Sequence, residues 1–166
     1  EMKKLEVKDL KDNFFEAIGK EWMLITAGTK EKFNTMTASW GGIGWLWNKP
    51  VAFVFVRPER YTYEFIEKSD YLTLSFLGEE NKKIHAVCGS KSGRNTDKVK
   101  ETGLKPVFTE GGKDCSFKHE VTIKEQGEGW IYLGNMTEKD ESYRILQYRP
   151  RRAFYNTNKE RTDLDQ

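Results

Sequence analysis

The stretch NTMTASWGG, residues 34–42, is the most informative part of this chain. It is uncharged, rich in hydroxyls and ends in two glycines, so its backbone can approach a flat polar ligand while Thr and Ser oxygens form directed hydrogen bonds. The apolar run VAFVFV, residues 51–56, predicts a buried strand. The segment RPERYT, residues 57–62, then places two arginines just past that strand, where loops commonly present binding groups. Together the three segments suggest a bound phosphorylated aromatic cofactor.

The composition indicates a single domain, residues 1–166, with a core of its own and a mobile tail from about residue 157. The net charge of +2 is too small to indicate a nucleic-acid partner. The two cysteines, Cys88 and Cys115, lack metal-ligand spacing and are too few for a disulfide scaffold, which favours a reducing compartment. No apolar run approaches the ~20 residues that span a bilayer, and the start lacks a signal-peptide core. We therefore expect a cytoplasmic protein with no membrane association.

Short strands and brief helices alternate along the chain. Strands are expected at 22–27, 33–39, 51–56, 71–77, 117–124, 129–135, 143–148 and 153–155, and the first two form a hairpin. Short helices are expected at about 8–17, 61–67, 81–87 and 96–102, and Thr62 is the expected cap of the second. This pattern favours a mainly β fold, a small β-barrel with helical insertions. A doubly wound parallel sheet would need long helices between its strands, and the chain contains no dinucleotide-binding fingerprint.

A third polar segment, GSKSGRNTDK at residues 89–98, completes a set of motifs that resembles the flavin reductase-like, FMN-binding split-barrel family, close to flavoredoxin. The other members of the set are NTMTASW at 34–40 and RPERYT at 57–62, and the order and intervals match over roughly residues 15–107. The resemblance implies a Greek-key split barrel that dimerises and holds one FMN per subunit near the interface. It also implies reduction of the flavin by a nicotinamide cofactor, NADH or NADPH, or electron exchange with a protein partner.

The candidate FMN-binding residues come from these motifs. The resemblance places the isoalloxazine ring beside Thr35, Met36, Thr37, Ala38, Ser39 and Trp40. The candidates for the phosphate are Arg57, Arg60 and Thr62, followed by Ser90, Lys91, Ser92 and Arg94. The alternatives are an ordinary strand with its hydroxyls in solvent, a pair of solvated arginines, and an exposed basic loop. The loop is not a phosphate-binding Walker A motif, because the required spacing and ending are absent.

Few other residues carry a chemical signal. Cys88 is expected to be buried and inert, and neither His85 nor His119 has a companion that suggests a metal site. We expect no catalytic side chain, because flavin hydride chemistry requires only alignment and tuning of the flavin. Trp45 and Trp47 are expected in the core or at a dimer contact.

The leading functional hypothesis is an FMN-binding oxidoreductase that moves two electrons between reduced nicotinamide and flavin or a substrate that accepts electrons from flavin. A flavin carrier without a substrate of its own is a second hypothesis. A split-barrel module that binds another small ligand is a third. A homodimer with the flavin near the interface is also expected, because three tryptophans within eight positions, 40–47, exceed what one small barrel can bury.

Overall fold

The computed structural model describes residues 4–5, 7–46, 48–69, 71–106, 121–122, 130–140 and 145–152. Its strands are β1 Lys4–Leu5, β2 Met23–Gly28, β3 Phe33–Ala38, β4 Gly41–Leu46, β5 Lys49–Val56, β6 Leu72–Ser75, β7 Val121–Thr122, β8 Trp130–Asp140 and β9 Ile145–Arg152. Its helices are the 3₁₀ turns η1 Val7–Asp9 and η2 Glu79–Asn81 and the α-helices α1 Phe14–Gly19, α2 Tyr61–Lys68, α3 Lys82–Ser90 and α4 Lys98–Thr102. In this described part of the chain, none of the helices has the length and apolar character needed to cross a membrane.

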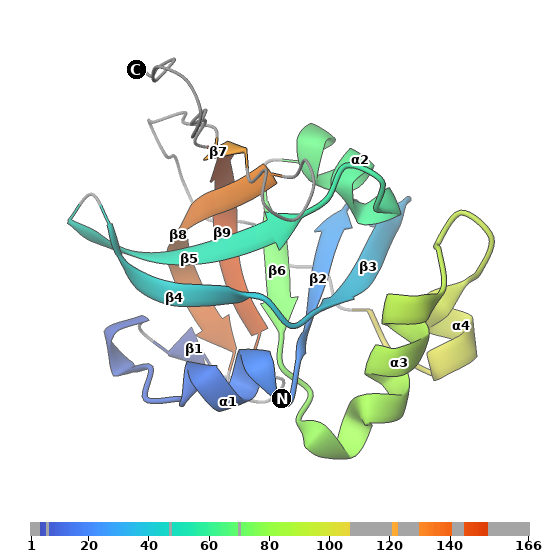
Figure 1. The fold of residues 1–166 in the computed structure, drawn as a ribbon, viewed down its shortest axis with the longest axis horizontal. Coiled ribbons are helices and arrows are strands. Elements are labelled where there is room, and N and C mark those ends of the chain that lie inside the picture. The colour runs from blue at the N-terminus through green and yellow to red at the C-terminus, as the bar shows by residue number, and fades with distance from the viewer. Residues whose placement is uncertain are drawn as a thin grey trace.

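The strands form one antiparallel sheet in the order β3-β2-β6-β9-β8-β5-β4, with β1 and β7 paired to β8. The two end strands, β3 and β4, are consecutive in the chain and are joined by Ser39 and Trp40. Figure 1 shows the β4–β5 hairpin crossing over β8, β9 and β6, so the sheet curls round on itself. At the corner, Gly41 has a φ of +144°, and a Cβ there would lie 2.6 Å from the Phe53 carbonyl oxygen. Only glycine fits this turn without strain.

The core fills the inside of the curled sheet. It is built from alternating apolar positions, which is the pattern of a sheet with one buried face. Its fully buried members include Met23, Ile25, Val54, Leu72 and Leu74. Among the helices, α2 packs against β2 and β3 and contributes Phe65 and Ile66 to this core, and α3 packs against β3. Figure 1 shows α3 and α4 together on the flank beside β3, so the segments that carry the sequence motifs are neighbours in space.

The predicted mainly β architecture and the 22–39 hairpin are confirmed. The bounds of the helix expected at 8–17 are wrong: Asn13 is the N-cap of α1, so the helix begins at Phe14 and ends at Gly19. The Asn13 carboxamide accepts from the Phe15 amide at 3.1 Å and the Glu16 amide at 3.4 Å. The helix expected at 81–87 continues as α3 to Ser90, so the polar loop begins at Lys91.

Strand β4 was not expected from the sequence, because three of its six residues are glycines and glycine weakens strands. It forms because it pairs with β5 along its whole length, from Gly41 opposite Val54 to Leu46 opposite Lys49. In the C-terminal third, β8 extends to Asp140, past the end of the strand expected at 129–135, and β9 extends to Arg152, past the end of the strand expected at 143–148, whose first two residues lie outside the described residues. The expected strand at 153–155 and the tail from about 157 lie outside the described residues.

Candidate functional site

The three sequence motifs meet at the start of α2. From β3, the Asn34 carboxamide nitrogen donates a hydrogen bond of 2.8 Å to the Thr62 hydroxyl of α2. The Arg60 guanidinium donates to the Gly89 carbonyl near the end of α3, at 3.3 Å. Arg94, in the loop of residues 91–97 between α3 and α4, lies over the Tyr61 ring at 4.7 Å. Segments nearly sixty residues apart in the sequence therefore form one cluster.

The first turn of α2 has no side-chain cap. The N-cap residue is Arg60, with φ −72° and ψ 133°, and no side chain accepts a hydrogen bond from the first amides at this position. The prediction that Thr62 caps the helix is wrong, because Thr62 is its second residue and is fully buried. Its hydroxyl is engaged by Asn34, and a phosphate contact by Thr62 stays a prediction. A helix start with uncapped amides beside an arginine favours an anion.

The structure divides the predicted cations into two groups. Arg57 lies 3.6 Å from the carboxylate of Glu59, Lys91 pairs with Glu101, and Arg94 pairs with Glu64. These three side chains are exposed to solvent, and each has a carboxylate partner. Arg60 is half-buried, and its hydrogen bond among the described residues goes to a neutral carbonyl. Arg60 is therefore the predicted cation whose charge remains available to a ligand.

Lys98 joins Arg60 in this second group, although it was not among the predicted site residues. Its side chain is only 6% exposed, and its ammonium donates to the Thr35 carbonyl at 2.7 Å and the Cys88 carbonyl at 2.9 Å. Burial lowers the pKa of Lys98; the nearby Cys88 raises it, and the positive charge of Arg60 lowers it. A buried ammonium that faces neutral partners and a second cation is a strong attractor for an anion.

Lys98 belongs to the segment that carries the resemblance, but nothing in its local sequence indicates burial. Asp97 caps α4 by accepting from the Lys100 amide at 3.0 Å, and Gly103 ends the helix in the left-handed conformation. These signals correctly predict a short helix here. They do not show that its first residue points under α3 toward β3.

The hydroxyls of β3 form hydrogen bonds within the protein. The Thr26 hydroxyl donates to that of Thr35 at 2.8 Å, and the Thr37 hydroxyl donates to the His85 carbonyl at 2.6 Å. The side chains of Met36 and Ala38 belong to the core. Because β3 is the end strand, one edge of its backbone is not used by a ladder with β2, and the Thr35 carbonyl lies on that edge. Strand alternation places the main-chain groups of Thr37 on the same edge.

At the corner after β3, Ser39 is partly exposed and Trp40 is 57% exposed. Within the predicted ring-binding segment, Trp40 is the exposed residue, and Ser39 is partly exposed, as is Thr37. Contacts of residues 35–40 with a flavin ring stay a prediction, and the structure favours backbone groups and the corner side chains over the two threonine hydroxyls.

The remaining predicted hydroxyls stabilise the loop itself. Ser90 donates to the Ala86 carbonyl at 2.7 Å within α3, and the Ser92 hydroxyl accepts from the Arg94 amide at 3.2 Å. Both side chains are exposed next to the cluster. Their contact with a phosphate stays a prediction.

Two buried side chains near the cluster, Cys88 and His85, have titratable groups. Cys88 is 1% exposed, so its expected burial is confirmed, and burial raises the pKa of its thiol while Lys98 lowers it. That the thiol is inert stays a prediction. His85 is fully buried, and neither ring nitrogen has a hydrogen-bond partner in the described structure. Among the described residues, no group of His, Cys, Asp and Glu could hold a metal ion. His119 and Cys115 lie outside the described residues.

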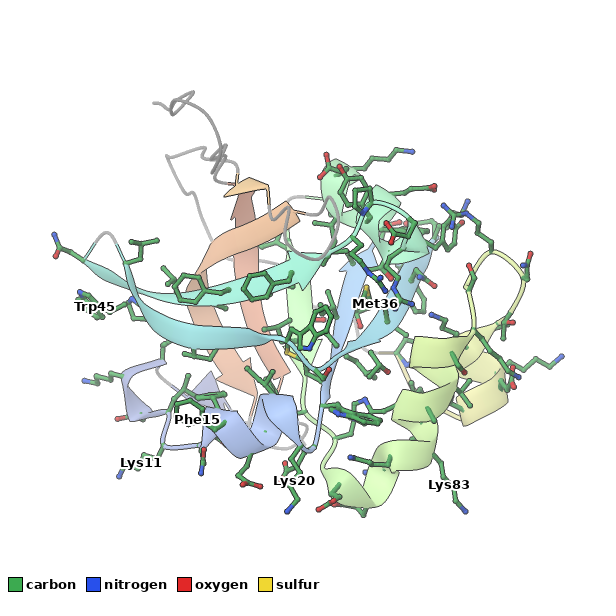
Figure 2. The ribbon with its side chains drawn as sticks, in the orientation of Figure 1. Lys11, Phe15, Lys20, Met36, Trp45 and Lys83 are labelled. Atoms are coloured by element: carbon green, nitrogen blue, oxygen red, sulfur yellow. The ribbon has the colours of Figure 1, made fainter. Side chains whose placement is uncertain are left out.

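The expected position of Trp45 in the core is not found. Trp45 is 70% exposed, so a place in the core is wrong for this residue. Figure 2 shows Trp45 on the β4–β5 hairpin and Phe15 on α1, both on the outer surface. Trp47 lies outside the described residues.

A curled antiparallel sheet whose end strands are β3 and β4, with a basic cluster at the start of α2, is the arrangement of a split barrel. Comparison with known proteins agrees with this class. The family model described as "Flavin reductase like domain" matches residues 15–128, and the chain belongs to this family. Family membership supports flavin binding, and flavin reduction or transfer, in general. A search of the curated proteins found no match.

The chain is also similar to solved structures. The FMN-binding domain of a flavin reductase-like enzyme from Shewanella baltica is 15% identical, with a TM-score of 0.54, and the match covers 90% of this chain and 74% of that one. This likeness confirms the split-barrel prediction. Flavoredoxin of Desulfovibrio vulgaris is 21% identical with a TM-score of 0.49, covering 78% of this chain and 66% of that one. Flavoredoxin from Methanosarcina acetivorans is 22% identical with a TM-score of 0.48, covering 79% and 64%. This chain therefore spans just under two thirds of either flavoredoxin.

Proposed function

We propose that this protein binds FMN and acts as an oxidoreductase that moves two electrons between a reduced nicotinamide and flavin or a substrate that accepts electrons from flavin. The observation that carries the proposal is the pair Arg60 and Lys98. Both cations have only carbonyl partners among the described residues, and both belong to the cluster at the uncapped start of α2. Such a site suits a phosphomonoester, which carries close to two negative charges at neutral pH.

The residues of the cluster divide the task of binding the phosphate. Arg60 presents a planar guanidinium that can hold two phosphate oxygens, and the α2 amides add directed donors. Lys98 supplies a positive charge from beneath, in a region of low water content where an ion pair is stronger than at the surface. Arg57, Lys91 and Arg94 lie farther toward solvent, with carboxylate partners, and we assign them the weaker role of attracting the anion.

The ring of the flavin would lie along the edge of β3 that does not pair with β2 and at the corner formed by Ser39 and Trp40. When bound, FMN supplies the hydride-accepting chemistry. The protein contributes alignment: the β3 backbone offers donors and acceptors to a flat polar edge, and the exposed part of Trp40 offers an apolar face. Flavin hydride transfer requires no protein acid or base in this scheme, and we assign no side chain of the cluster such a role.

We further propose that the protein is a homodimer. Phe15 is 95% exposed and Trp45 is 70% exposed, and α1 packs against β4, which carries Trp45. A two-fold contact would use the same apolar surface twice. Light scattering at micromolar concentration should give the mass of a dimer, and a monomer mass with and without FMN would contradict it.

The test of the proposed function is a titration followed by reduction. FMN should bind stoichiometrically and at least tenfold more tightly than riboflavin, about 1.4 kcal/mol, because only FMN carries the phosphate. NADH or NADPH should then bleach the bound flavin under anaerobic conditions. Equal affinity for the two flavins would contradict the phosphate site. Tight FMN binding without bleaching by either nicotinamide would instead indicate an electron carrier.

A further inference from the structure

Asn34 is buried at the point where β3, α2 and the 91–97 loop meet. The residue is 7% exposed, although asparagine is usually found at the surface. The carboxamide nitrogen donates to the fully buried hydroxyl of Thr62 at 2.8 Å. This hydrogen bond joins β3 to the first turn of α2.

The other side of the same carboxamide lies against Gly93 in the loop. A Cβ at Gly93 would come 2.8 Å from Asn34 Cγ, and closer still to its Oδ1, and would also lie 3.1 Å from the Tyr61 ring. The loop backbone can occupy this place only because residue 93 has no side chain. One buried amide therefore fixes the start of α2 and sets the closest approach of the loop.

The next residue of β3 holds the second cation. The Thr35 carbonyl accepts from the Lys98 ammonium at 2.7 Å, while Arg60 stands at the start of the helix that Asn34 holds through Thr62. Adjacent residues of β3 therefore hold both cations in place: Asn34 holds Arg60 indirectly, through Thr62 and the start of α2, and Thr35 holds Lys98 directly. Their separation depends on contacts of β3 rather than on either helix alone.

We propose that Asn34 is a positioning residue for the phosphate site. It fixes the start of α2, with Arg60 and the first α2 amides, at a set distance from the 91–97 loop and from Lys98. This inference rests on the proposed function and adds a residue that does not itself touch the ligand. Because a bidentate phosphate contact is sensitive to small displacements, release of α2 from β3 weakens the grip on the phosphate. It leaves contacts to the flavin ring unchanged.

The experiment measures the dissociation constants of FMN and riboflavin, by quenching of flavin fluorescence, for the wild type and three variants. Asn34→Ala removes the amide, and Thr62→Val removes the same hydrogen bond from its other end while preserving side-chain shape. Both should weaken FMN binding about tenfold and change riboflavin binding less than twofold. Thr62→Val provides the answer if Asn34→Ala does not fold.

Asn81→Ala is the matched control. Its carboxamide nitrogen also makes one hydrogen bond, to the Leu77 carbonyl at 2.6 Å, but at the opposite end of α3 from the loop. It should lower the melting temperature without changing the ratio of the two dissociation constants. A ratio that stays at the wild-type value in folded Asn34→Ala or Thr62→Val would overturn the role of Asn34 alone. Equal affinity of the wild type for FMN and riboflavin would overturn the phosphate site and this proposal with it.

Discussion

The substitution Gly93→Ala probes the packing of the loop against Asn34. Gly93 has a φ outside the left-handed region, so its backbone tolerates alanine. The new methyl group would displace the Asn34 carboxamide and break its 2.8 Å hydrogen bond to Thr62. Leaving these buried polar groups unsatisfied costs about 1–3 kcal/mol. The lower entropy of the unfolded alanine chain offsets about 0.4–1 kcal/mol.

The expected net loss is therefore about 1–2 kcal/mol in the free energy of unfolding, or a decrease of about 2–8 °C in melting temperature for a chain of this size. In an Asn34→Ala background the closest remaining neighbour is Tyr61 Cδ2 at 3.1 Å, and Gly93→Ala should cost less than about 0.5 kcal/mol. Urea unfolding of the wild type, the two single variants and the double variant gives the coupling energy between positions 34 and 93, which we expect to be about 1 kcal/mol or more.

Gly19→Ala is the control for the general effect of adding a methyl group. Nothing lies within 4 Å of a Cβ at Gly19, at the end of α1, so this variant should be neutral or slightly more stable. The reasoning would be refuted if Gly93→Ala cost the same in both backgrounds, because the loop would then not press against the carboxamide of Asn34.

Three further measurements address the charged and titratable groups. Arg60→Ala should weaken FMN binding by about 1.5–3 kcal/mol with the fold intact, and an unchanged dissociation constant would remove Arg60 from the site. Lys98→Met should weaken the binding of FMN about 10- to 100-fold and leave the binding of riboflavin unchanged. Lys100, on the same helix, is exposed, so Lys100→Met should change the binding of neither flavin. Parallel losses for both flavins in Lys98→Met would instead indicate a structural role for Lys98. Burial, and secondarily Lys82, lowers the pKa of His85 below its ordinary 6.5, so the unfolded chain binds the extra proton and stability should fall as the pH drops below about 6.5. His85→Leu should lose this part of the pH dependence in urea unfolding at pH 7.5 and 5, and an identical slope for both proteins would show that His85 does not contribute.

Local signals in the sequence predicted many elements of the fold. Strands β2, β3, β5 and β6 follow from runs of apolar residues, and the two ends of α4 follow from Asp97 and Gly103. These signals depend on a few neighbouring residues, so they can be read without knowing how the rest of the chain folds. The resemblance carried by three motifs identified the family, because the motifs preserve residue types and intervals.

Tertiary structure decided how these pieces meet. The six-residue strand β4 forms in spite of three glycines because β5 supplies its hydrogen-bond partners, and the sheet joins β6 to β9 across some seventy residues of sequence. Neither pairing has a local signal. Register and partner choice depend on which surfaces the whole chain can bury at once.

The same distinction applies to the candidate site. The sequence identified Arg60 as a candidate cation, but it could not separate it from Arg94, whose partner Glu64 lies 30 residues away. It also did not indicate that Lys98 is buried or that Thr62 bonds to Asn34, 28 residues distant. The charge available to a ligand is what remains after each cation has met its partners. Because those partners come from distant segments, only the folded chain determines which cations are neutralised and which remain to hold an anion.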